Sequence, residues 1–413
     1  MTLQESGRIT RPDNGAGANR TPLRLLTLST LFPNARQPRH GIFVANRLAR
    51  LRDSGRVQAS VVAAVPWFPA MYREYAAVPR RETLLGFDVR HPRYLHVPGL
   101  GMRMQPDSLA RALLQELRRC RMDAASFDLV DAHYFYPDGV AAARIADELG
   151  LPLVISARGS DINRIGEIPF ARDRMLQAAH RAEALIAVSV ALGAKMASMG
   201  MPAENIHVLR NGVDSTMFLP APRAEARALL GLAENDRCVL GVGNLVPEKG
   251  FDLLIRAVSS LAEVRLLIVG EGPLRRELRA LADQLAPGRV EFRDNVPQPE
   301  LRHVYSACDV LGVPSLREGW PNVVLEAMAC GIPVVASAVG GLPEIVLPDA
   351  PSRLVEERSA VAWEQALRSL LESPPSPATV RDYALGFGWD EVVSRQIDLY
   401  DAVVRSRSIA RAR

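Results

Sequence analysis

The segment Glu318-Gly-Trp-Pro-Asn-Val-Val-Leu-Glu326, followed by Ala-Met-Ala-Cys-Gly-Ile-Pro, places two carboxylates eight residues apart across a loop and the start of a helix. Pro321 is expected as the first helical residue, Gly331 as the cap and Pro333 as the start of a buried strand. Amides at a helix start bind phosphate and carboxylates bind hydroxyl groups, so the combination suggests a nucleotide sugar as ligand. The alternative is a solvated helix with two ordinary glutamates.

Working outward from this segment, the chain divides into two series of strands and helices. Its 413 residues exceed one ordinary hydrophobic core and predict two domains of about 200 residues each. Continuous apolar runs that alternate with helical patterns predict parallel sheets covered on both faces. The first series ends before Pro220 and Pro222, and the second begins at Cys238. The predicted divisions are a polar, disordered leader over 1–20, α/β domains over 21–215 and 216–385, and a helix over 386–413 that packs back on the first domain.

Composition excludes several classes of protein. With 48% hydrophobic and 23% charged residues, the chain is globular in type. It has no run of about 18 apolar residues, and residues 1–20 lack an apolar signal core, so neither a spanning helix nor a secretion signal is expected. Cys120, Cys238, Cys308 and Cys330 show no Cys-x-x-Cys pair and no His at metal-ligand spacing. They are predicted to be reduced core residues in the cytoplasm, without a metal site.

Basic residues concentrate in the N-terminal half of the chain. From Arg36 to Arg121 there are sixteen Arg against six acidic residues, whereas the net charge of the whole chain is +4. The side chains interleaved with them are Phe43, Trp67, Phe68, Met71, Tyr72 and Tyr75. Such a surface suits anionic lipid or a diphosphate-linked acceptor, at about 1 kcal/mol per basic residue near an anionic surface. The alternative is a solvated Arg-rich face.

Lysine is rare, which makes its position informative. Of the 50 basic residues, Lys195 and Lys249 are the two that are not Arg. Lys249 lies in Gly243-Asn-Leu-Val-Pro-Glu-Lys-Gly250, where a compact ammonium group is favoured over a planar guanidinium, with chance as the rival explanation. Gly241 and Gly243 lack the third Gly of a dinucleotide fingerprint, because Val246 stands at that position. The segment also differs from a Walker A loop, since its Lys precedes the last Gly and no Ser or Thr follows. A dinucleotide-dependent dehydrogenase is therefore disfavoured.

The Glu-x7-Glu segment, with its Glu-Gly-x-Pro-Asn start and Glu-Ala-Met-Ala-x-Gly-x-Pro-Val-Val end, resembles the signature of the family 4 retaining glycosyltransferases. The resemblance extends from about residue 23 to residue 404. It implies an α/β protein of the GT-B fold, with two facing Rossmann-like, doubly wound domains, the acceptor side on the first and the donor site mostly on the second. The segments that begin at Pro38 and His91 look most like exopolysaccharide, capsule and teichuronic-type transferases.

The resemblance also implies roles for individual residues. His133, at the end of a predicted buried strand, would approach the primary hydroxyl of the sugar, although a lone His is more often structural. His133, Lys249 and Glu318 are the implied catalytic residues. The implied donor-binding residues are Gly41, Gly243, Asn244, Lys249, Gly270, Gly272, Val296, Glu318, Gly319, Trp320, Pro321, Asn322 and Glu326, with Glu326 on the ribose hydroxyls. Arg158 and Asp161 are implied on the acceptor side. Asn244 stands where the family commonly has Arg, and Arg158 where it has His.

The resemblance implies a retaining, metal-independent hexosyltransferase. Its donor would be a nucleotide sugar, with UDP-sugars favoured, and its acceptor a glycan or polyprenyl-diphosphate-linked saccharide in cell-surface polysaccharide synthesis. No cofactor and no nucleic-acid partner are expected, and the predicted location is the cytoplasm or the inner face of the membrane. The alternative is a catalytically inactive GT-B scaffold that binds a lipid-linked glycan, which Asn244 and Arg158 favour. A dinucleotide-dependent oxidoreductase is a third, weaker hypothesis.

Overall fold

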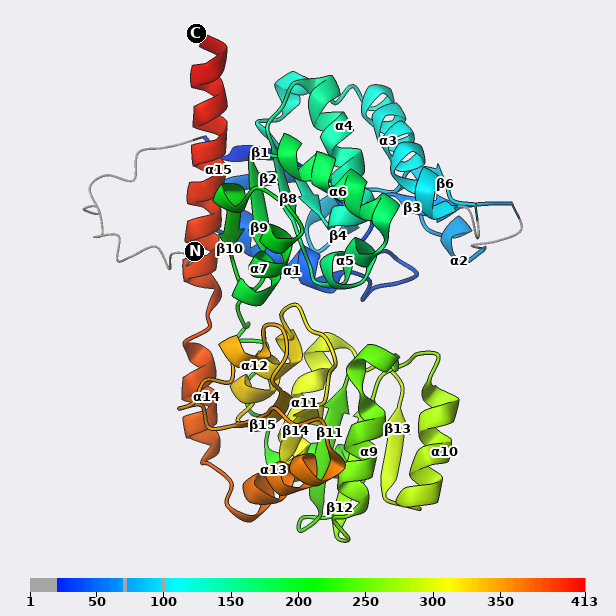
Figure 1. Ribbon diagram of the computed structural model, residues 1–413, viewed down its shortest axis with the longest axis vertical. Coiled ribbons are helices and arrows are strands. Elements are labelled where there is room, and N and C mark those ends of the chain that lie inside the picture. The colour runs from blue at the N-terminus through cyan, green and yellow to red at the C-terminus, as the bar shows by residue number, and fades with distance from the viewer. Residues whose placement is uncertain (1–20, 70–72, 98–100, 413) are drawn as a thin grey trace, which may run out of the picture.

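The structure is a computed structural model that describes residues 21–69, 73–97 and 101–412. The predicted leader over residues 1–20, the surface residues Met71 and Tyr72, and the pair Pro98-Gly99 lie outside the described residues. The described chain forms two α/β domains stacked along the long axis of the molecule, with the last helix running beside the N-terminal domain (Figure 1).

The N-terminal domain is built on an eight-stranded sheet in the order β10-β9-β8-β7-β1-β2-β5-β4. The strands are β1 Leu23–Leu28, β2 Val57–Val62, β4 Arg81–Leu84, β5 Phe87–Arg90, β7 Leu129–His133, β8 Leu153–Ser156, β9 Ala184–Ala187 and β10 Ile206–Val208. All neighbours are parallel except β4 and β5, which form an antiparallel hairpin at one edge. Strands β3 Val65–Trp67 and β6 Arg93–Leu95 pair separately, in parallel.

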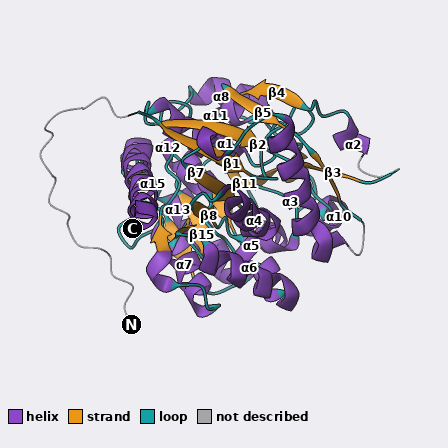
Figure 2. Ribbon diagram, turned by 90° about the horizontal axis from the view of Figure 1, so that it is seen from above, coloured by secondary structure: helices purple, strands orange, loops and turns teal. Residues whose placement is uncertain are grey.

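Helices cover both faces of this sheet, as parallel topology requires. They are α1 Ile42–Asp53, α2 Arg73–Ala76, α3 Gly101–Arg119, α4 Val140–Leu149, α5 Ser160–Asn163, α6 Pro169–Arg181 and α7 Val190–Ser198. Seen from above, the helices lie around the strands (Figure 2). All four cysteines are free, and three are buried, whereas Cys120, predicted to be in the core, is half-buried just after α3.

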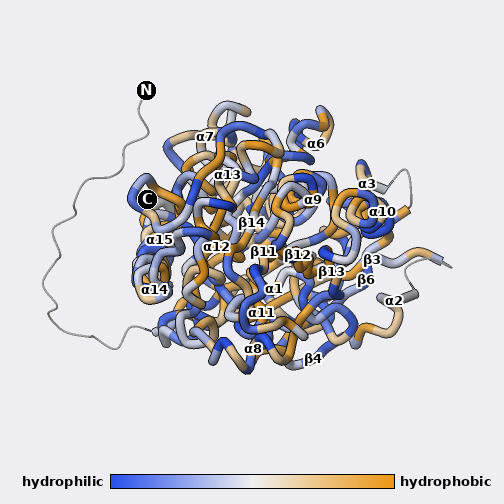
Figure 3. Tube along the Cα trace, turned by 90° about the horizontal axis from the view of Figure 1, so that it is seen from below, coloured by the Kyte–Doolittle hydropathy of each residue, from blue (hydrophilic) through white to orange (hydrophobic). Residues whose placement is uncertain are grey.

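The C-terminal domain is built on a six-stranded, fully parallel sheet in the order β13-β12-β11-β14-β15-β16. Its strands are β11 Arg237–Val242, β12 Val264–Val269, β13 Val290–Arg293, β14 Val310–Val313, β15 Val334–Ser337 and β16 Arg353–Val355. Its helices are α8 Arg223–Leu230, α9 Phe251–Ser259, α10 Arg275–Leu285, α11 Leu301–Ala307, α12 Asn322–Ala329, α13 Ala360–Glu372 and α14 Pro377–Leu385. Apolar residues concentrate along the central strands β11 and β14 (Figure 3).

Strand order determines where a ligand can bind. In each sheet the first strand of the domain has neighbours on both sides: β1 lies between β7 and β2, and β11 lies between β12 and β14. The chain adds strands first on one side of it and then on the other, so the strand order reverses there. Such a reversal leaves a crevice at the carboxyl ends of the strands. The loops that follow β7, β8, β11 and β14 at those ends contain most of the residues singled out in the sequence.

The final helix, α15 Trp389–Ala412, returns to the N-terminal domain. Its residues Ile397, Tyr400 and Val403 are buried in one cluster with Leu25 and Leu48 of β1 and α1. Burial of these side chains fixes α15 to the first sheet, although the helix follows the second domain in sequence.

Truncation of one buried α15 side chain should therefore lower the free energy of unfolding, and the size of the decrease reports how strongly α15 is packed on the N-terminal domain. Ile397→Ala removes apolar atoms from a site that is 6% exposed, so the free energy of unfolding should fall by about 2–5 kcal/mol. The matched control is Asp398→Ala, because Asp398 is the exposed neighbour on the same turn and should change stability by about 0.5 kcal/mol or less. Denaturant titration of both variants is the measurement. Equal stability of the two would show that α15 does not contribute to the core.

Candidate functional site

The Glu-x7-Glu segment follows β14 at the carboxyl edge of the second sheet. Pro321 lies just before α12 in an extended conformation, so the prediction that it is the first helical residue was wrong by one position; the helix begins at Asn322. Gly331 lies just beyond the helix with a φ of 83°, a left-handed conformation that suits glycine after a helix end. The two glutamates thus lie on either side of the helix start, Glu318 in the loop and Glu326 in the helix.

Lys249 and Glu318 meet across the loops that follow β11 and β14. The Lys249 Nζ lies 2.5 Å from Glu318 Oε1, which also accepts a hydrogen bond of 2.7 Å from Ser315 Oγ. Lys249 is half-buried and the Glu318 side chain nearly buried. Two residues predicted to contact the donor from segments 69 positions apart therefore form one ion pair. Ser315 was not identified from the sequence, since a lone Ser gives no pattern.

Glu326 has a different environment from Glu318. Its side chain is buried, Tyr305 Oη donates a hydrogen bond of 2.9 Å to Oε2, and Gln298 Nε2 lies 3.4 Å from Oε1. Burial raises the pKa of Glu326 to about 7, although both hydrogen bonds act to lower it. The resemblance assigned Glu326 to the ribose hydroxyls of the donor, and the buried contact with Tyr305 was not predicted from the sequence.

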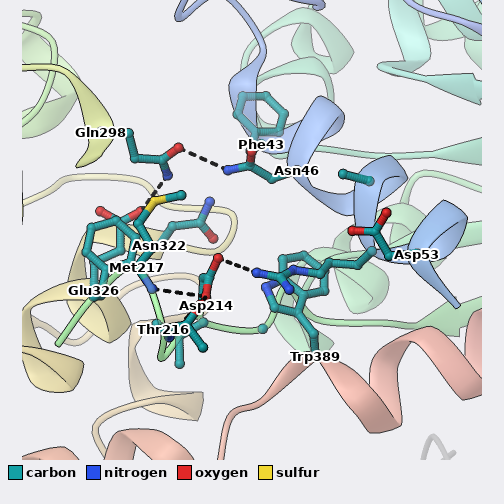
Figure 4. A pocket seen from close by; sticks show the side chains of 15 residues that line it. Phe43, Asn46, Asp53, Asp214, Thr216, Met217, Gln298, Asn322, Glu326 and Trp389 are labelled. Carbon is teal, nitrogen blue, oxygen red and sulfur yellow. Dashed lines mark hydrogen bonds and ion pairs between the residues drawn. The ribbon is translucent and has the colours of Figure 1, made fainter. Parts of the chain in front are cut away.

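A cavity of about 350 Å³ lies between the two domains next to Glu326 (Figure 4). The N-terminal domain contributes residues of α1, and the C-terminal domain contributes Asn322, Glu326 and Gln298. Asn46 Nδ2 of α1 donates a hydrogen bond of 3.1 Å to Gln298 Oε1 across the gap. Phe43, counted in the sequence as part of an Arg-rich surface, lines this cavity instead.

His133 lies at the end of β7 and is completely buried. Its Nε2 is 2.8 Å from Asp131 Oδ2, and its Nδ1 accepts from the Arg158 guanidinium. Burial lowers the pKa of His133, and although burial acts to raise the pKa of Asp131, its contacts with His133 and Tyr400 hold it below the usual value. The ring is therefore neutral with its proton on Nε2, because a carboxylate only accepts and a guanidinium only donates. Both ring nitrogens contact protein side chains.

The loop after β8 contains both residues predicted on the acceptor side. Asp161 is buried and accepts backbone N–H groups of Phe135, Arg158 and Gly159 at 2.8–3.0 Å. Burial raises the pKa of Asp161, which these amides oppose. Asp161 thus determines the shape of the loop, while the side chain of Arg158 extends to His133 and lies over the Phe43 ring at 5.8 Å.

The loop after β8 and the loop after β14 touch backbone to backbone. A Cβ on Gly319 would lie 2.7 Å from the Arg158 carbonyl oxygen and 3.0 Å from the Gly159 Cα, so a larger residue would separate the domains. Trp320, predicted to contact the donor, is nearly buried and its Nε1 donates 2.9 Å to the Asn211 carbonyl oxygen. Asn211 Nδ2 in turn donates 3.2 Å to Asn322 Oδ1 at the start of α12.

The glycine-rich loops of the second domain pack on one another. Gly270 has a φ of 151°, and a Cβ there would lie 1.9 Å from the Gly243 carbonyl oxygen. Gly272 follows in the same turn. Asn244 is exposed and Val296 half-buried beyond β13. Gly41 lies on the other domain, as the residue before α1, with a φ of 65° and no space for a Cβ beside Leu31. The predicted donor residues therefore come from both walls of the interdomain region.

Two Rossmann-like domains that face each other at the carboxyl ends of their sheets define the GT-B fold. Sequence comparison agrees: residues 71–216 match the model of "Glycosyltransferase Family 4" and residues 222–386 that of "Glycosyl transferases group 1". The chain belongs to the family 4 glycosyltransferases. It is 30% identical over 419 residues to D-inositol 3-phosphate glycosyltransferase 1 of Catenulispora acidiphila, covering 93% of this chain and 96% of that protein.

Other relatives extend the comparison. The chain is 28% identical to a putative teichuronic acid biosynthesis glycosyltransferase of Bacillus subtilis, over 84% of this chain and 88% of that protein. Among solved structures, sucrose-phosphate synthase of Thermosynechococcus elongatus superposes with a TM-score of 0.78 at 21% identity, over 93% of this chain and 100% of that one. The Anabaena protein HepE, in complex with UDP and glucose, gives 0.72 at 21% identity, over 92% and 100%. These structures support the fold.

The described part of the chain holds neither a metal-ligand cluster nor a membrane-spanning helix. No group of three or more His, Cys, Asp or Glu side chains within residues 21–69, 73–97 and 101–412 has a geometry that could hold a metal ion. Within the same ranges, no helix is both long and apolar enough to cross a bilayer.

The buried carboxyl of Glu326 should make stability depend on pH. Its pKa is about 7 in the folded chain against 4.5 for an ordinary Glu, so its favourable contribution is complete below pH 4.5 and is lost as pH rises to about 7. At about 1.36 kcal/mol per pH unit, this interval corresponds to about 3 kcal/mol. Glu326→Gln stays neutral, so its stability relative to the native chain should rise by that order between pH 4.5 and 7.5.

Chemical denaturation at several pH values measures this difference. Glu225→Gln, a change at an exposed glutamate of α8, is the matched control and should follow the native chain at every pH. A constant gap between Glu326→Gln and the native chain would contradict a carboxyl that titrates near neutrality.

Proposed function

We propose that this glycosyltransferase transfers a sugar from a nucleotide-sugar donor, with UDP-sugars favoured, to a glycan or polyprenyl-diphosphate-linked acceptor, with retention of anomeric configuration. The observation that carries the proposal is the Lys249–Glu318 pair beside the start of α12. An ammonium group and first-turn amides suit a diphosphate, and an adjacent carboxylate suits sugar hydroxyls. That HepE was solved with UDP and glucose agrees with this choice of donor.

Breaking the sugar–phosphate bond places negative charge on the leaving diphosphate. Donors fixed near that charge stabilise the transition state more than the ground state. Lys249 and the amides of Asn322 and Val323 would supply this stabilisation, and Glu318 would hold the sugar. Glu326, next to the interdomain cavity, would receive the ribose hydroxyls. In the retaining route the leaving phosphate takes the proton from the acceptor hydroxyl, so no carboxylate acts as nucleophile.

On the opposite wall, His133 would act through Arg158, because its ring is completely buried and both of its nitrogens contact protein side chains. His133 Nδ1 accepts from the Arg158 guanidinium, and the backbone of Arg158 lies against Gly319. Arg158 would then present a cation to the acceptor side, with Asp161 maintaining the loop.

The donor assignment is tested with Lys249→Met. Without its ammonium group, kcat/KM for transfer or hydrolysis of a labelled UDP-sugar should fall by about 100- to 1,000-fold, the usual effect of removing one transition-state donor. Lys195→Met is the matched control, because Lys195 is the other lysine of the chain and pairs with Glu167 on the N-terminal domain. Assays run in EDTA should retain activity, as no metal is proposed.

Three results would count against this proposal. Turnover of no nucleotide sugar by the native chain, combined with binding of a lipid-linked glycan, would favour the inactive scaffold. Equal activity of the two Lys variants would reject the assigned phosphate site. Loss of activity in EDTA that Mn²⁺ or Mg²⁺ restores would reject the metal-independent route.

We also propose that the N-terminal domain docks on an anionic membrane surface to reach its acceptor. Trp67 and Leu95 stand opposite each other in the β3–β6 pair and are 47% and 43% exposed, and Met104 nearby on α3 is 54% exposed. Arg80 and Arg103 are exposed on the same domain. Not all of the sixteen Arg residues counted between Arg36 and Arg121 lie on the surface, because Arg47 is 1% exposed.

Sedimentation with lipid vesicles tests this docking surface. The native chain should bind vesicles that contain anionic lipid and release them between 0.1 and 1 M salt, as the Debye length falls from about 10 to about 3 Å. Trp67→Ser should weaken binding, whereas Leu229→Ser, at a site 67% exposed on the other domain, should not. Equal binding to neutral vesicles, or equal effects of the two variants, would reject the surface.

A further inference from the structure

A chain of buried polar contacts joins α15 to both walls of the site. Tyr400 Oη of α15 donates 2.9 Å to Asp131 Oδ1, whose other oxygen receives His133 Nε2. Gln396, one turn earlier on α15, donates 2.5 Å from Nε2 to the Tyr400 oxygen. Its own Oε1 accepts a bond of 2.6 Å from Arg47 Nε. The direction of each hydrogen bond in this series, from Arg47 through Gln396 and Tyr400 to Asp131, is therefore fixed.

The first branch determines the state of His133. Asp131 is completely buried, and a buried carboxylate needs several donors to remain ionised. The Tyr400 hydroxyl and the His133 ring supply the two short contacts, while Thr27 Oγ1 lies at 3.5 Å. Without the hydroxyl, Asp131 Oδ1 would lose its donor, so the carboxylate could rotate and would no longer hold the His133 ring in one orientation. The ring could then no longer offer Nδ1 to Arg158 in every molecule.

The second branch reaches the donor side. Arg47 Nη1 donates 3.0 Å to the Leu209 carbonyl oxygen and 3.1 Å to Asn211 Oδ1, and the Asn211 amide continues to Asn322 at the start of α12. Gln396 therefore orients Arg47, and Arg47 orients the segment that enters the second domain. One face of α15 is connected to His133 and to the Glu-x7-Glu helix through side chains that are at most 5% exposed, apart from the Asn322 end.

We propose that Tyr400 and Gln396 are positioning residues for sugar transfer: Tyr400 orients His133 and Arg158 through Asp131, and Gln396 orients the start of α12 through Arg47 and Asn211. The inference rests on the proposed function and adds the C-terminal helix to the machinery of the site. Neither residue touches the cleft loops itself. Their effect should therefore appear in the rate of the bound complex more than in donor affinity.

Tyr400→Phe keeps the ring in the core and removes only the hydroxyl. Its kcat should fall by about tenfold, as expected for one misaligned polar contact, while the donor KM stays within about twofold. Gln396→Met, which keeps the approximate volume, should lower kcat in the same direction. Tyr383→Phe is the matched control, because its hydroxyl donates 2.7 Å to the Ile345 carbonyl oxygen of the second domain, and its kcat should not change.

Ile397→Ala separates positioning from packing on the same helix. This variant should unfold at a lower temperature than Tyr400→Phe and yet retain the native kcat. A native kcat in Tyr400→Phe, or a loss of kcat in proportion to stability across all four variants, would overturn the proposal.

A second measurement does not depend on turnover. Side-chain ¹⁵N spectra of the seven histidines report which nitrogen carries the proton, and His133→Asn identifies the signal of His133. Both the native chain and Tyr400→Phe should show the Nε2–H form, because Asp131 still accepts and Arg158 still donates, but the Nε2 proton of Tyr400→Phe should exchange with water faster. If the native chain transfers no sugar but this faster exchange occurs, the proposed function fails and the positioning of His133 stands. An unchanged exchange rate of the His133 proton refutes the positioning whatever the activity.

Discussion

The buried guanidinium of Arg47 connects three parts of the chain that are remote in sequence. It lies on α1 and is buried from water. It donates hydrogen bonds to Gln396 of α15 and to the segment from Leu209 to Asn211. Burial lowers its pKa to about 9, so it stays charged at neutral pH. A buried charge is costly unless its donors are paired; Nε and Nη1 of Arg47 are paired, whereas Nη2 is buried without a hydrogen-bond partner. The fold therefore depends on α15 and the interdomain segment both meeting α1 at this point, which also fixes Asn211 next to Asn322.

The two acid–base contacts of the site differ in exposure and in charge. Lys249 and Glu318 form an ion pair in which Lys249 is 27% exposed, so its attraction is partly screened by solvent. The Asp131–His133 contact is a completely buried hydrogen bond between a carboxylate and a neutral ring, and loss of either partner would leave a buried polar group unpaired. The Lys249–Glu318 contact is thus the easier of the two to rearrange.

Sequence patterns predicted most of the fold because they are local. Continuous apolar segments such as that of β12 predicted parallel sheets. The Glu-x7-Glu pattern predicted the start of α12 to within one residue. Contacts between distant segments were not predictable. An Arg between Asn46 and Leu48 is ordinarily exposed, and only the arrival of Gln396, 349 residues later, buries Arg47. Tyr305 and Tyr400 belong to no motif in the sequence, and their hydroxyl partners Glu326 and Asp131 follow from tertiary packing alone.

The two departures from the family pattern lie on opposite walls, and their charges compensate. The resemblance implies an Arg at the position of Asn244, which is exposed, and a His at the position of Arg158. Burial lowers the pKa of Arg158 to about 10, so its guanidinium remains charged, and its Nε and Nη1 are buried without a hydrogen-bond partner. In the proposed site, therefore, the cation missing at Asn244 beside the leaving phosphate is matched by the additional cation of Arg158 on the facing wall. Lys249 then neutralises more of the diphosphate charge, and the ammonium, a compact point charge rather than a planar fork, can follow that charge as it moves onto the leaving oxygen.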